Sequence, residues 1–189
     1  MDANRIYYDC EFLDDGRTIA PISIGMVDNL GHSLYRIIRD DVTIGRAFNS
    51  PWLRANVLPH LPVRQLSDTW AWDTGNSHMH YVRDRAQVAQ DIKHFVASQP
   101  GTELWSWYGA YDHVMVAQLL GPMADLPEGF PMFTCDLEQE IRRLGLADKH
   151  SLLPGQNPRE AHSALADARW HRRIGNFLLK YEHGDPVEL

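Results

Sequence analysis

The order of strand-like and helix-like segments along the chain constrains its fold more than any other feature. Three segments rich in β-branched and aromatic residues come first, and the second and third flank a turn at 28–31, as in a hairpin. These predicted strands cover residues 5–9, 19–27 and 33–38. A strand signal at 103–108 then alternates with helical spacing of apolar residues. The predicted helices cover residues 83–98, 111–120, 136–144 and 163–181. Strands followed by strand–helix alternation indicate an α/β fold.

The middle of the chain gives weaker signals. Ser50 precedes Pro51, and proline is favoured at the first position of a helix, so we predict a short helix over 51–58. The stretch from there to Tyr81 has no clear period and is predicted to be an irregular excursion from the sheet. No internal repeat or linker is visible, and 189 residues fit one medium domain, so we predict a single domain over 1–189.

Composition excludes several classes of protein. Hydrophobic residues make up 44% of the chain and charged residues 23%, as in folded rather than disordered or fibrous proteins. No stretch approaches the roughly 18 apolar residues that cross a bilayer, and residues 1–8 lack the apolar core of a signal peptide. We therefore expect no membrane partner and a cytoplasmic location. Cys10 and Cys135 lie in apolar surroundings and are predicted to be buried thiols. The formal net charge of −7 means that any contact with nucleic acid must be local.

Two acidic residues end the first predicted strand. Asp9 and Glu11 are two positions apart, so both side chains project from the same face of the sheet. Two carboxylates placed together at the end of an apolar strand need a cation or a proton to neutralise them. Taken alone, the pair is better explained by a strand that runs into the polar turn at 14–16.

Two later segments carry further candidates. Asp112 falls in the first turn of the helix after the strand at 103–108, where it can also simply complement the helix dipole. Ser163 can cap the last helix, with His162 at its entrance and Asp167 pointing inward from its body. A lone histidine near a helix start is more often a cap or a surface residue. Only the combination of the three segments favours a functional site.

In order and context these segments resemble the three motifs of the DEDDh family of 3′-5′ exonucleases. Asp-x-Glu follows a first strand, Asp follows a later strand, and His-x-x-x-x-Asp opens a C-terminal helix. The resemblance spans Asp9 to Asp167 and implies a ribonuclease H-like exonuclease fold, with a central mixed β-sheet flanked by α-helices. It further implies that Asp9, Glu11, Asp112 and Asp167 bind two divalent ions and that His162 takes the proton from the attacking water.

The type of ligand fits this implication. Carboxylates without a cysteine among them form a hard oxygen site, which suits Mg²⁺ or Mn²⁺ rather than zinc. Two ions about 4 Å apart can position a water for in-line attack on the last phosphodiester and stabilise the leaving oxygen. The unperturbed pKa of histidine, about 6.5, leaves it able to accept a proton at neutral pH. We therefore expect two Mg²⁺ ions, with Mn²⁺ as a substitute, and a 5′-mononucleotide product.

Within the DEDDh family, the start Tyr-Asp-Cys-Glu-Phe at 8–12 is similar to the polyadenylate-specific exoribonucleases, the ribonuclease AS group. This likeness implies a single-stranded RNA 3′ end as substrate, a preference for poly(A) and a homodimer. Glu11, Phe12 and Leu13 match family positions that touch the terminal nucleotide. Trp107 and Tyr108 stand where many relatives carry His-Asn. An aromatic pair there can stack on a base, although two aromatics on a strand more often pack in the core.

Three alternatives stay open at the level of sequence. A DNA or proofreading 3′-5′ exonuclease would use the same metal chemistry, because that chemistry is indifferent to the sugar, and a comparison of RNA with DNA ends separates the two. A catalytically silent nucleic-acid-binding relative would show no metal-dependent turnover. A small-nucleotide phosphohydrolase would show no dependence of rate on oligomer length.

Overall fold

A central mixed sheet organises the computed structural model, which describes residues 4–67, 69–97 and 101–186. The sheet has six strands in the order β6-β3-β2-β1-β7-β8. Its antiparallel part is the meander β1 (Asn4–Asp14), β2 (Ile19–Asp28) and β3 (Ser33–Ile38). Parallel strands extend it on both sides: β6 (Val82–Arg83) beside β3, β7 (Thr102–Ser106) beside β1, and β8 (Cys135–Asp136) beside β7. The predicted N-terminal meander is confirmed.

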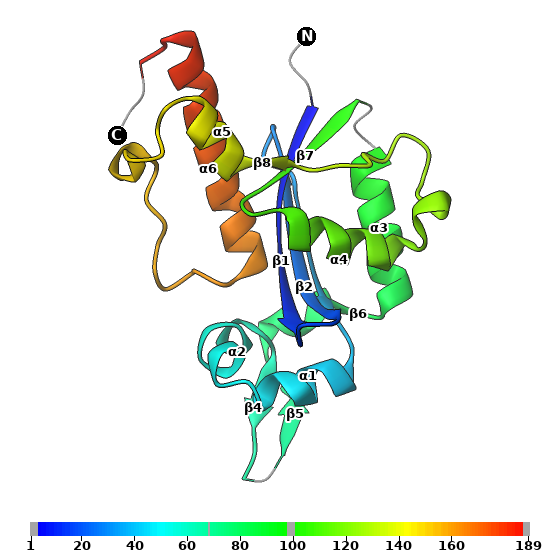
Figure 1. Cartoon of the computed structure of the whole chain (residues 1–189). Coiled ribbons are helices and arrows are strands. Elements are labelled where there is room, and N and C mark those ends of the chain that lie inside the picture. The colour runs from blue at the N-terminus through cyan, green and yellow to red at the C-terminus, as the bar shows by residue number, and fades with distance from the viewer. Residues whose placement is uncertain (1–3, 68, 98–100, 187–189) are drawn as a thin grey trace.

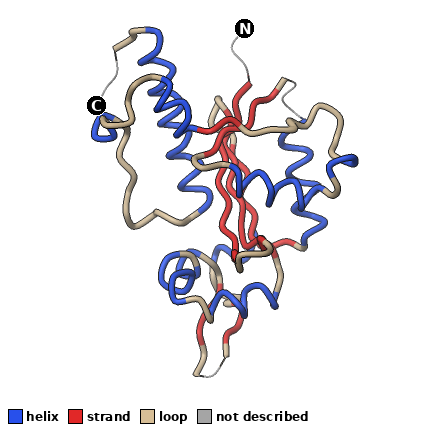
Figure 2. Tube along the Cα trace, viewed as in Figure 1, coloured by secondary structure: helices blue, strands red, loops and turns tan. Residues whose placement is uncertain are grey.

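Helices cover both faces of this sheet and one of its ends (Figure 1). On one side lie α3 (Arg85–Ala97) and α4 (Ala110–Leu120), and on the other α5 (Leu137–Arg143) and α6 (Ala164–His183). Beyond the end of β1 lie α1 (Asp41–Phe48), α2 (Pro51–Asn56) and the hairpin β4 (Val63–Gln65) with β5 (Trp70–Trp72). Short 3-10 turns occur at Leu58–His60, Ser77–Tyr81, Met123–Asp125 and His150–Leu152. Figure 2 shows the strands of the six-stranded sheet between the two groups of helices. The predicted α/β fold, a central mixed sheet flanked by helices, is confirmed.

Alternation along β1 distributes its side chains between the two helical layers. Tyr8 and Cys10 belong to the buried cluster that contains residues of α3 and α4. Tyr7 belongs to the cluster formed with α5 and α6. Because side chains on a strand alternate between faces, Asp9 and Glu11 share the side of Tyr7 and point toward the α6 layer.

Two glycines allow α6 to approach the sheet closely. Gly25 pairs with Asp9 across β1 and β2, and a Cβ added at Gly25 would lie 2.3 Å from the carbonyl oxygen of Ala164. A Cβ added at Gly175 would lie 2.2 Å from the ring of Tyr7. The first turn of α6 therefore lies against the backbone of β2 directly beside Asp9.

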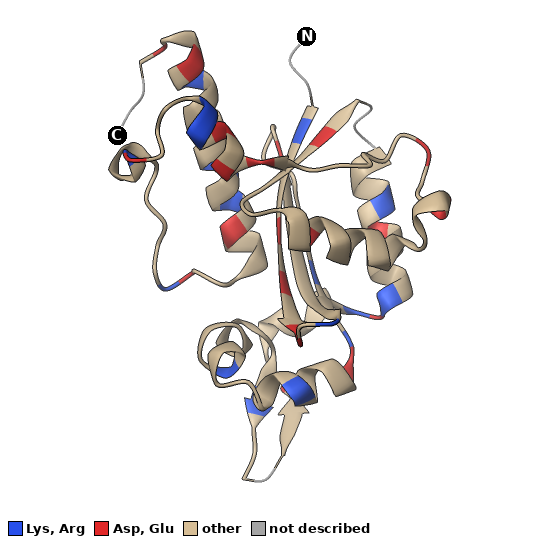
Figure 3. Ribbon diagram, viewed as in Figure 1, with Lys and Arg blue, Asp and Glu red and all other residues tan. Residues whose placement is uncertain are grey.

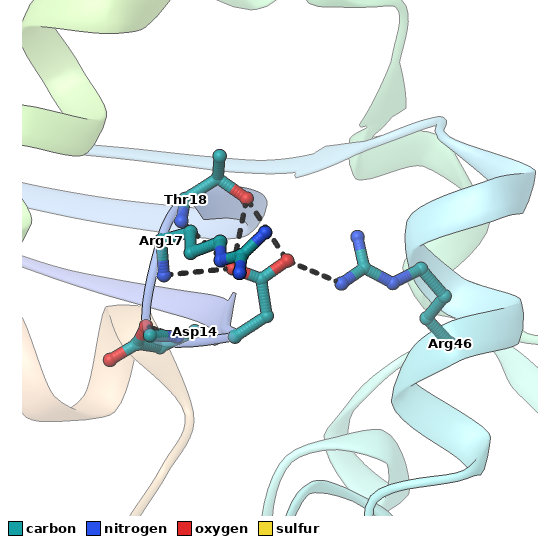
Figure 4. A network of polar contacts seen from close by, with 6 residues as sticks. Asp14, Arg17, Thr18 and Arg46 are labelled. Carbon is teal, nitrogen blue, oxygen red and sulfur yellow. Dashed lines mark hydrogen bonds and ion pairs between the residues drawn. The ribbon is translucent and has the colours of Figure 1, made fainter.

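The turn between β1 and β2 is tied to α1 by polar contacts (Figure 4). The carboxylate of Asp15 accepts hydrogen bonds from the backbone N–H groups of Arg17 and Thr18, and Arg46 of α1 donates to its Oδ2 at 2.7 Å. The bond from the Thr18 N–H, together with Arg46, lowers the pKa of Asp15. This network holds the end of β1 against the helices that lie beyond the sheet.

Several predicted boundaries differ from the structure. β1 runs on to Asp14, so Asp9 and Glu11 lie inside the strand and not at its end. The strand predicted over 103–108 ends at Ser106, because Tyr108 adopts a left-handed backbone with φ of 56°. The predicted helix 51–58 divides into α2 and a 3-10 turn that contains Pro59, which has no N–H to continue the helix.

Other differences concern the excursion and the longer helices. The chain from 50 to 81 is not wholly irregular, since it contains the β4–β5 hairpin, and α1 before it was not predicted. α3 begins at Arg85 because Val82–Arg83 pairs with β3, while the Asp84 carboxylate accepts the N–H of Gln87. The predicted end of that helix at Ser98 lies outside the described residues.

The two cysteines are free thiols. Cys10 is buried, but Cys135 is only half-buried, so the prediction of two buried thiols holds fully for Cys10 alone. Among the helices that the structure describes, none combines the length and the apolarity needed to cross a membrane.

Candidate active site

Carboxylates that are far apart in the sequence meet in one cleft. Asp9 and Glu11 come from the middle of β1, Asp112 from the first turn of α4 and Asp167 from the first turn of α6. All four line a cleft of about 260 Å³, together with His162, which immediately precedes the N-cap of α6. The structure therefore brings together all five residues predicted from the three sequence segments.

Asp112 occupies the place where two strands separate. β1 and β7 pair only as far as Tyr7 and Trp105, so the edge of β1 is free beyond that point. The N–H of Cys10 donates to Oδ1 of Asp112 at 2.8 Å, and the Ser106 hydroxyl donates to Oδ2 at 3.2 Å. The carboxylate thus replaces a neighbouring strand for β1, and both of its oxygens are held by protein donors.

Asp167 is held in a similar way. The backbone N–H of His162 donates to its Oδ2 at 2.9 Å, and the Gln156 amide donates to its Oδ1. Ser163 has the backbone conformation of an N-cap, but its side chain makes no capping bond, contrary to the prediction. The Asp167 carboxylate instead binds the chain just before the helix and fixes His162 beside it.

His162 and Tyr108 share an unusual backbone. They are the non-glycine residues with positive φ in the described part of the chain, at 64° and 56°, and both line the cleft. A left-handed backbone costs a non-glycine residue on the order of 1 kcal/mol, and such strain persists where the surrounding structure imposes it. The chain is therefore constrained at two points on the rim of this cleft.

The electrostatics of the cleft favour a bound cation. Burial raises the pKa of Asp9 and of Glu11 well above the usual range, and the neighbouring carboxylates raise both further. Burial also raises the pKa of Asp112 to about 7 and that of Asp167 to about 6, although hydrogen bonds from the protein act in the opposite direction. Four carboxyl groups that resist ionisation together are neutralised most simply by divalent metal.

The donor set also fits such an ion. A carboxylate oxygen of Glu11, one of Asp167 and a ring nitrogen of His162 lie within 4.8 Å of one another, so the two carboxylates can share an ion beside the imidazole. Carboxylate oxygens are the ligands that Mg²⁺ and Mn²⁺ prefer. The cleft can therefore hold a hard divalent cation among its acidic residues.

His162 lies in surroundings that keep its imidazole neutral. Burial lowers its pKa, and the nearby His60 lowers it further. The ring of Trp52 contacts it edge to face, with centroids 4.8 Å apart. A neutral imidazole at the rim of an acidic cleft can accept a proton.

Three of the residues predicted to contact substrate, Phe12, Trp107 and Tyr108, line the cleft but differ in how they pack and how exposed they are. Phe12 lines the cleft and stacks on Tyr111 with centroids 6.2 Å apart. Trp107 and Tyr108 also line it, past the end of β7 rather than on the strand. Trp107 stacks on Trp170 of α6 at 4.8 Å and so packs as well as lining the cleft, whereas Tyr108 is 65% exposed.

Leu13 is the predicted contact that the structure does not bring to the cleft. Its side chain is buried in a core cluster with residues of α1 and α2. The register of β1 against β2 shifts between Glu11 and Phe12, which changes the direction of the side chains that follow.

Sequence reasoning missed several residues of the site. Trp52 and Tyr111 line the cleft, while Ser106 and Gln156 hold its carboxylates. Tyr111 precedes Asp112 in the chain, and its position next to a candidate ligand was a usable signal. Trp52 and Gln156 belong to segments without a chemical pattern, so nothing in the sequence singled them out.

Comparison with known proteins agrees with this geometry. The model of the 3′-5′ exoribonuclease Rv2179c-like domain family matches residues 4–179. The chain belongs to this family. It is 38% identical over 167 residues to the 3′-5′ exoribonuclease Rv2179c of Mycobacterium tuberculosis strain H37Rv, and the match covers 87% of each chain. The 3′-5′ exoribonuclease MT2234.1 of M. tuberculosis strain CDC 1551 matches with the same identity and coverage.

Solved structures show that the fold of this Rv2179c-like domain is shared with exonucleases. S. pombe Pop2p, solved with Mg²⁺ and Mn²⁺ bound, aligns with a TM-score of 0.58 at 12% identity, covering 98% of this chain and 86% of Pop2p. Exonuclease I from Methylocaldum szegediense aligns with a TM-score of 0.56 at 16% identity, covering 96% of this chain and 41% of that enzyme. The predicted ribonuclease H-like exonuclease fold is confirmed by these likenesses.

Proposed function

We propose that this protein is a 3′-to-5′ exoribonuclease that removes 5′-mononucleotides from RNA 3′ ends by two-metal-ion hydrolysis. The observation that carries the proposal is the meeting of Asp9, Glu11, Asp112, Asp167 and His162 in one cleft. Membership of the Rv2179c-like family supports the choice of RNA.

The carboxylates hold the metal in this proposal. By resemblance to the DEDDh family, Asp9 would serve both Mg²⁺ ions, Glu11 and Asp167 would hold one of them together with Asp9, and Asp112 would serve the other mainly through water. The indirect role suits Asp112, because both of its oxygens already accept hydrogen bonds from Cys10 and Ser106. Bound divalent ions supply positive charge that neutralises the four acids and stabilises the negative charge of the reacting phosphate. Mn²⁺ can replace Mg²⁺.

His162 acts as the general base. Its imidazole takes a proton from the attacking water while the water oxygen forms a bond to the last phosphorus, and the bond from phosphorus to the 3′-oxygen of the preceding nucleotide breaks. That oxygen gains a proton from solvent water and becomes the new 3′-hydroxyl, His162 returns its proton to the solvent, and the released nucleotide carries a 5′-phosphate. The lowered pKa of His162 favours this role, because it favours the neutral ring, which can accept a proton.

The aromatic residues of the cleft position the last nucleotide. The stacked rings of Phe12 and Tyr111 form one wall, and the exposed ring of Tyr108 stands on the same rim. Aromatic rings are suited to stack on an unpaired base. In this proposal Glu11 and Phe12 contact the terminal nucleotide, while Trp107 supports the wall from its stacked position on Trp170.

Finer features of the proposal follow from the resemblance to the ribonuclease AS group. They are a preference for adenylate-rich 3′ ends, a homodimer and a cytoplasmic location, and they stay predictions. We also propose that residues 1–189 act as one exonuclease domain.

The test is release of mononucleotides from 3′-labelled and 5′-labelled oligo(A), oligo(U) and matching DNA, with Mg²⁺, Mn²⁺ or chelator. We expect metal-dependent, stepwise shortening of RNA from its 3′ end, fastest on oligo(A). An Asp9→Asn/Glu11→Gln variant should be inactive, whereas Asp125→Asn, which changes an exposed aspartate outside the cleft, should match the wild type. Equal or faster shortening of DNA would indicate a DNA exonuclease. No turnover on any polymer would contradict the proposal.

A further inference from the structure

A second cavity adjoins the cleft on the other side of the α6 N-terminus. It has a volume of about 440 Å³ and lies between α6 and the segments around His60 and Ser77–Tyr81. Its lining includes the basic and aromatic residues Arg169, Arg173, His60, His78, Tyr35 and Tyr81. Apart from His60, which lowers the pKa of His162, none of these residues takes part in the proposed chemistry.

The charges of the cavity and of the cleft are opposite. The described residues that line the cleft include four carboxylates and neither lysine nor arginine. Those that line the second cavity include two arginines and two histidines against one acidic residue, Glu160. In a chain with a net charge of −7, such a basic concave surface is a local exception.

The arginines of this cavity are available to a ligand. Arg169 and Arg173 lie one helical turn apart on α6, so their side chains emerge on the same side of the helix, and Figure 3 shows basic positions spaced along it. Within the described part of the chain, the Arg169 guanidinium forms no hydrogen bond or ion pair, and that of Arg173 donates once, to the carbonyl of Gly155 at 3.1 Å. A guanidinium presents five donors in a planar fork that matches phosphate oxygens.

Two contacts connect the cavity with the cleft. Gln156 lines the cavity and donates to Asp167 in the cleft. Ser163 also lines the cavity and directly follows His162 in the chain. An RNA strand whose last phosphodiester lies among the carboxylates can therefore continue past Gln156 and Ser163 into the second, basic cavity.

We propose that this cavity binds the phosphodiester backbone of the RNA upstream of the bond that is cleaved, with Arg169 and Arg173 as the phosphate contacts. The inference rests on the proposed exoribonuclease function. It answers a physical difficulty, because the upstream phosphates would be repelled by the acidic cleft and need cationic partners nearby. The arginines bind the phosphates whatever the base, and the cleft selects the terminal nucleotide.

The test is binding of 5′-labelled oligo(A) in chelator, which prevents turnover, at several salt concentrations. The variant Arg169→Gln/Arg173→Gln removes both guanidinium groups while retaining good helix propensity. The control Lys149→Gln/Lys180→Gln removes the same charge from exposed positions that line neither the cleft nor the second cavity. Thermal unfolding of each variant checks that it folds.

We expect the arginine variant to bind oligo(A) about tenfold more weakly or worse, with the control within about twofold of the wild type. Each single-strand phosphate contact contributes about 0.7 to the slope of log affinity against log salt, so losing two should lower the slope by about 1.4. Uncharged methylphosphonate at all linkages upstream of the last one should weaken binding to the wild type much more than binding to the arginine variant.

Equal binding by the arginine variant and the control would overturn the proposal, as would equal methylphosphonate penalties in the wild type and the arginine variant. If AMP binds in an arginine-dependent way and oligo(A) does not, the cavity takes a free nucleotide and the strand proposal is wrong. Turnover with metal is measured separately. Arginine-dependent binding without turnover would refute the exoribonuclease function but retain the cavity, and turnover with arginine-independent binding would refute the cavity alone.

Discussion

Replacement of Gly25 by alanine tests whether the close approach of α6 to the sheet assembles the site. The added Cβ would lie 2.3 Å from the carbonyl oxygen of Ala164 and 2.5 Å from Cα of Leu165, where ordinary contacts begin at 3.4 Å. Both are backbone atoms, so no side chain can rotate to relieve the clash. The first turn of α6 must therefore move away by about 1 Å, the difference between these distances.

That displacement would act directly on catalysis. Asp167 is in the first turn of α6, and the backbone N–H of His162 is hydrogen-bonded to the Asp167 carboxylate. Both residues would therefore move away from Asp9 and Glu11, which stay on β1. A misplacement of about 1 Å can lower a rate on the order of 10²-fold. Overpacking of this kind also lowers the free energy of unfolding by about 1–3 kcal/mol. We expect kcat to fall about a hundredfold, with weaker activation by Mg²⁺.

The assay is kcat on oligo(A) at saturating Mg²⁺, measured well below the thermal midpoint of each variant. The control is Gly175→Ala, whose added Cβ would clash with the Tyr7 ring further along the same helix. It should lower stability to a similar degree while retaining most of kcat, because that clash lies away from the first turn of α6. A folded Gly25→Ala protein with normal kcat would refute the reasoning, and so would an equal loss of kcat in Gly175→Ala.

Three further predictions concern proton and metal chemistry. His162→Ala should lower kcat about 10²- to 10⁴-fold, while Mg²⁺ binding, measured by calorimetry, is retained. The rise of wild-type kcat with pH should have its midpoint below about 6.5, because burial lowers the pKa of His162. A fully active variant, or a midpoint above that value, would contradict the role of His162 as base. The pKa values of Asp112 and Asp167 are raised to about 7 and about 6, so the folded metal-free protein binds more protons than the unfolded chain. Its thermal midpoint should therefore fall as pH rises from about 4 to 7, and Mg²⁺ should remove that decline. A midpoint that rises over this range would refute the electrostatic argument. Ser106→Ala removes a donor to Asp112 and should weaken Mg²⁺ activation about 10- to 100-fold, an expectation that unchanged metal dependence would exclude.

The carboxylates and the histidine of the site could be predicted because their residue types and spacings are recognisable within short segments of the sequence. The alternation of a strand places Asp9 and Glu11 on one face, and the entrance of a helix separates His162 from Asp167. The way in which Asp112 is held could not be predicted. It depends on where β1 and β7 stop pairing, which is a property of the sheet and not of either segment.

The region between β3 and α3 was the least predictable. The sequence of α1 contains β-branched residues and Gly45, all weak helix formers, so its helical pattern is faint. Its stability comes from tertiary context, since Asp40 caps it and Ile44 and Ala47 are fully buried. Trp52 belongs to the same region, and its contact with His162 becomes visible only when these helices are placed beside the site.

The distribution of charge suggests why metal and RNA should bind together. Without a cation the carboxylates of the cleft repel the last phosphodiester, while the basic cavity beyond Gln156 still attracts the phosphates before it. If both proposals hold, RNA docks through its upstream backbone in either state, but its 3′ end enters the cleft only after metal has neutralised the acids. Affinity for long RNA should depend weakly on Mg²⁺, whereas affinity for a dinucleotide should depend on it strongly. In this scheme an acidic protein binds RNA because the attraction for phosphates is confined to one cavity. The 3′ end enters the acidic cleft only when the metal ions needed for its cleavage are bound.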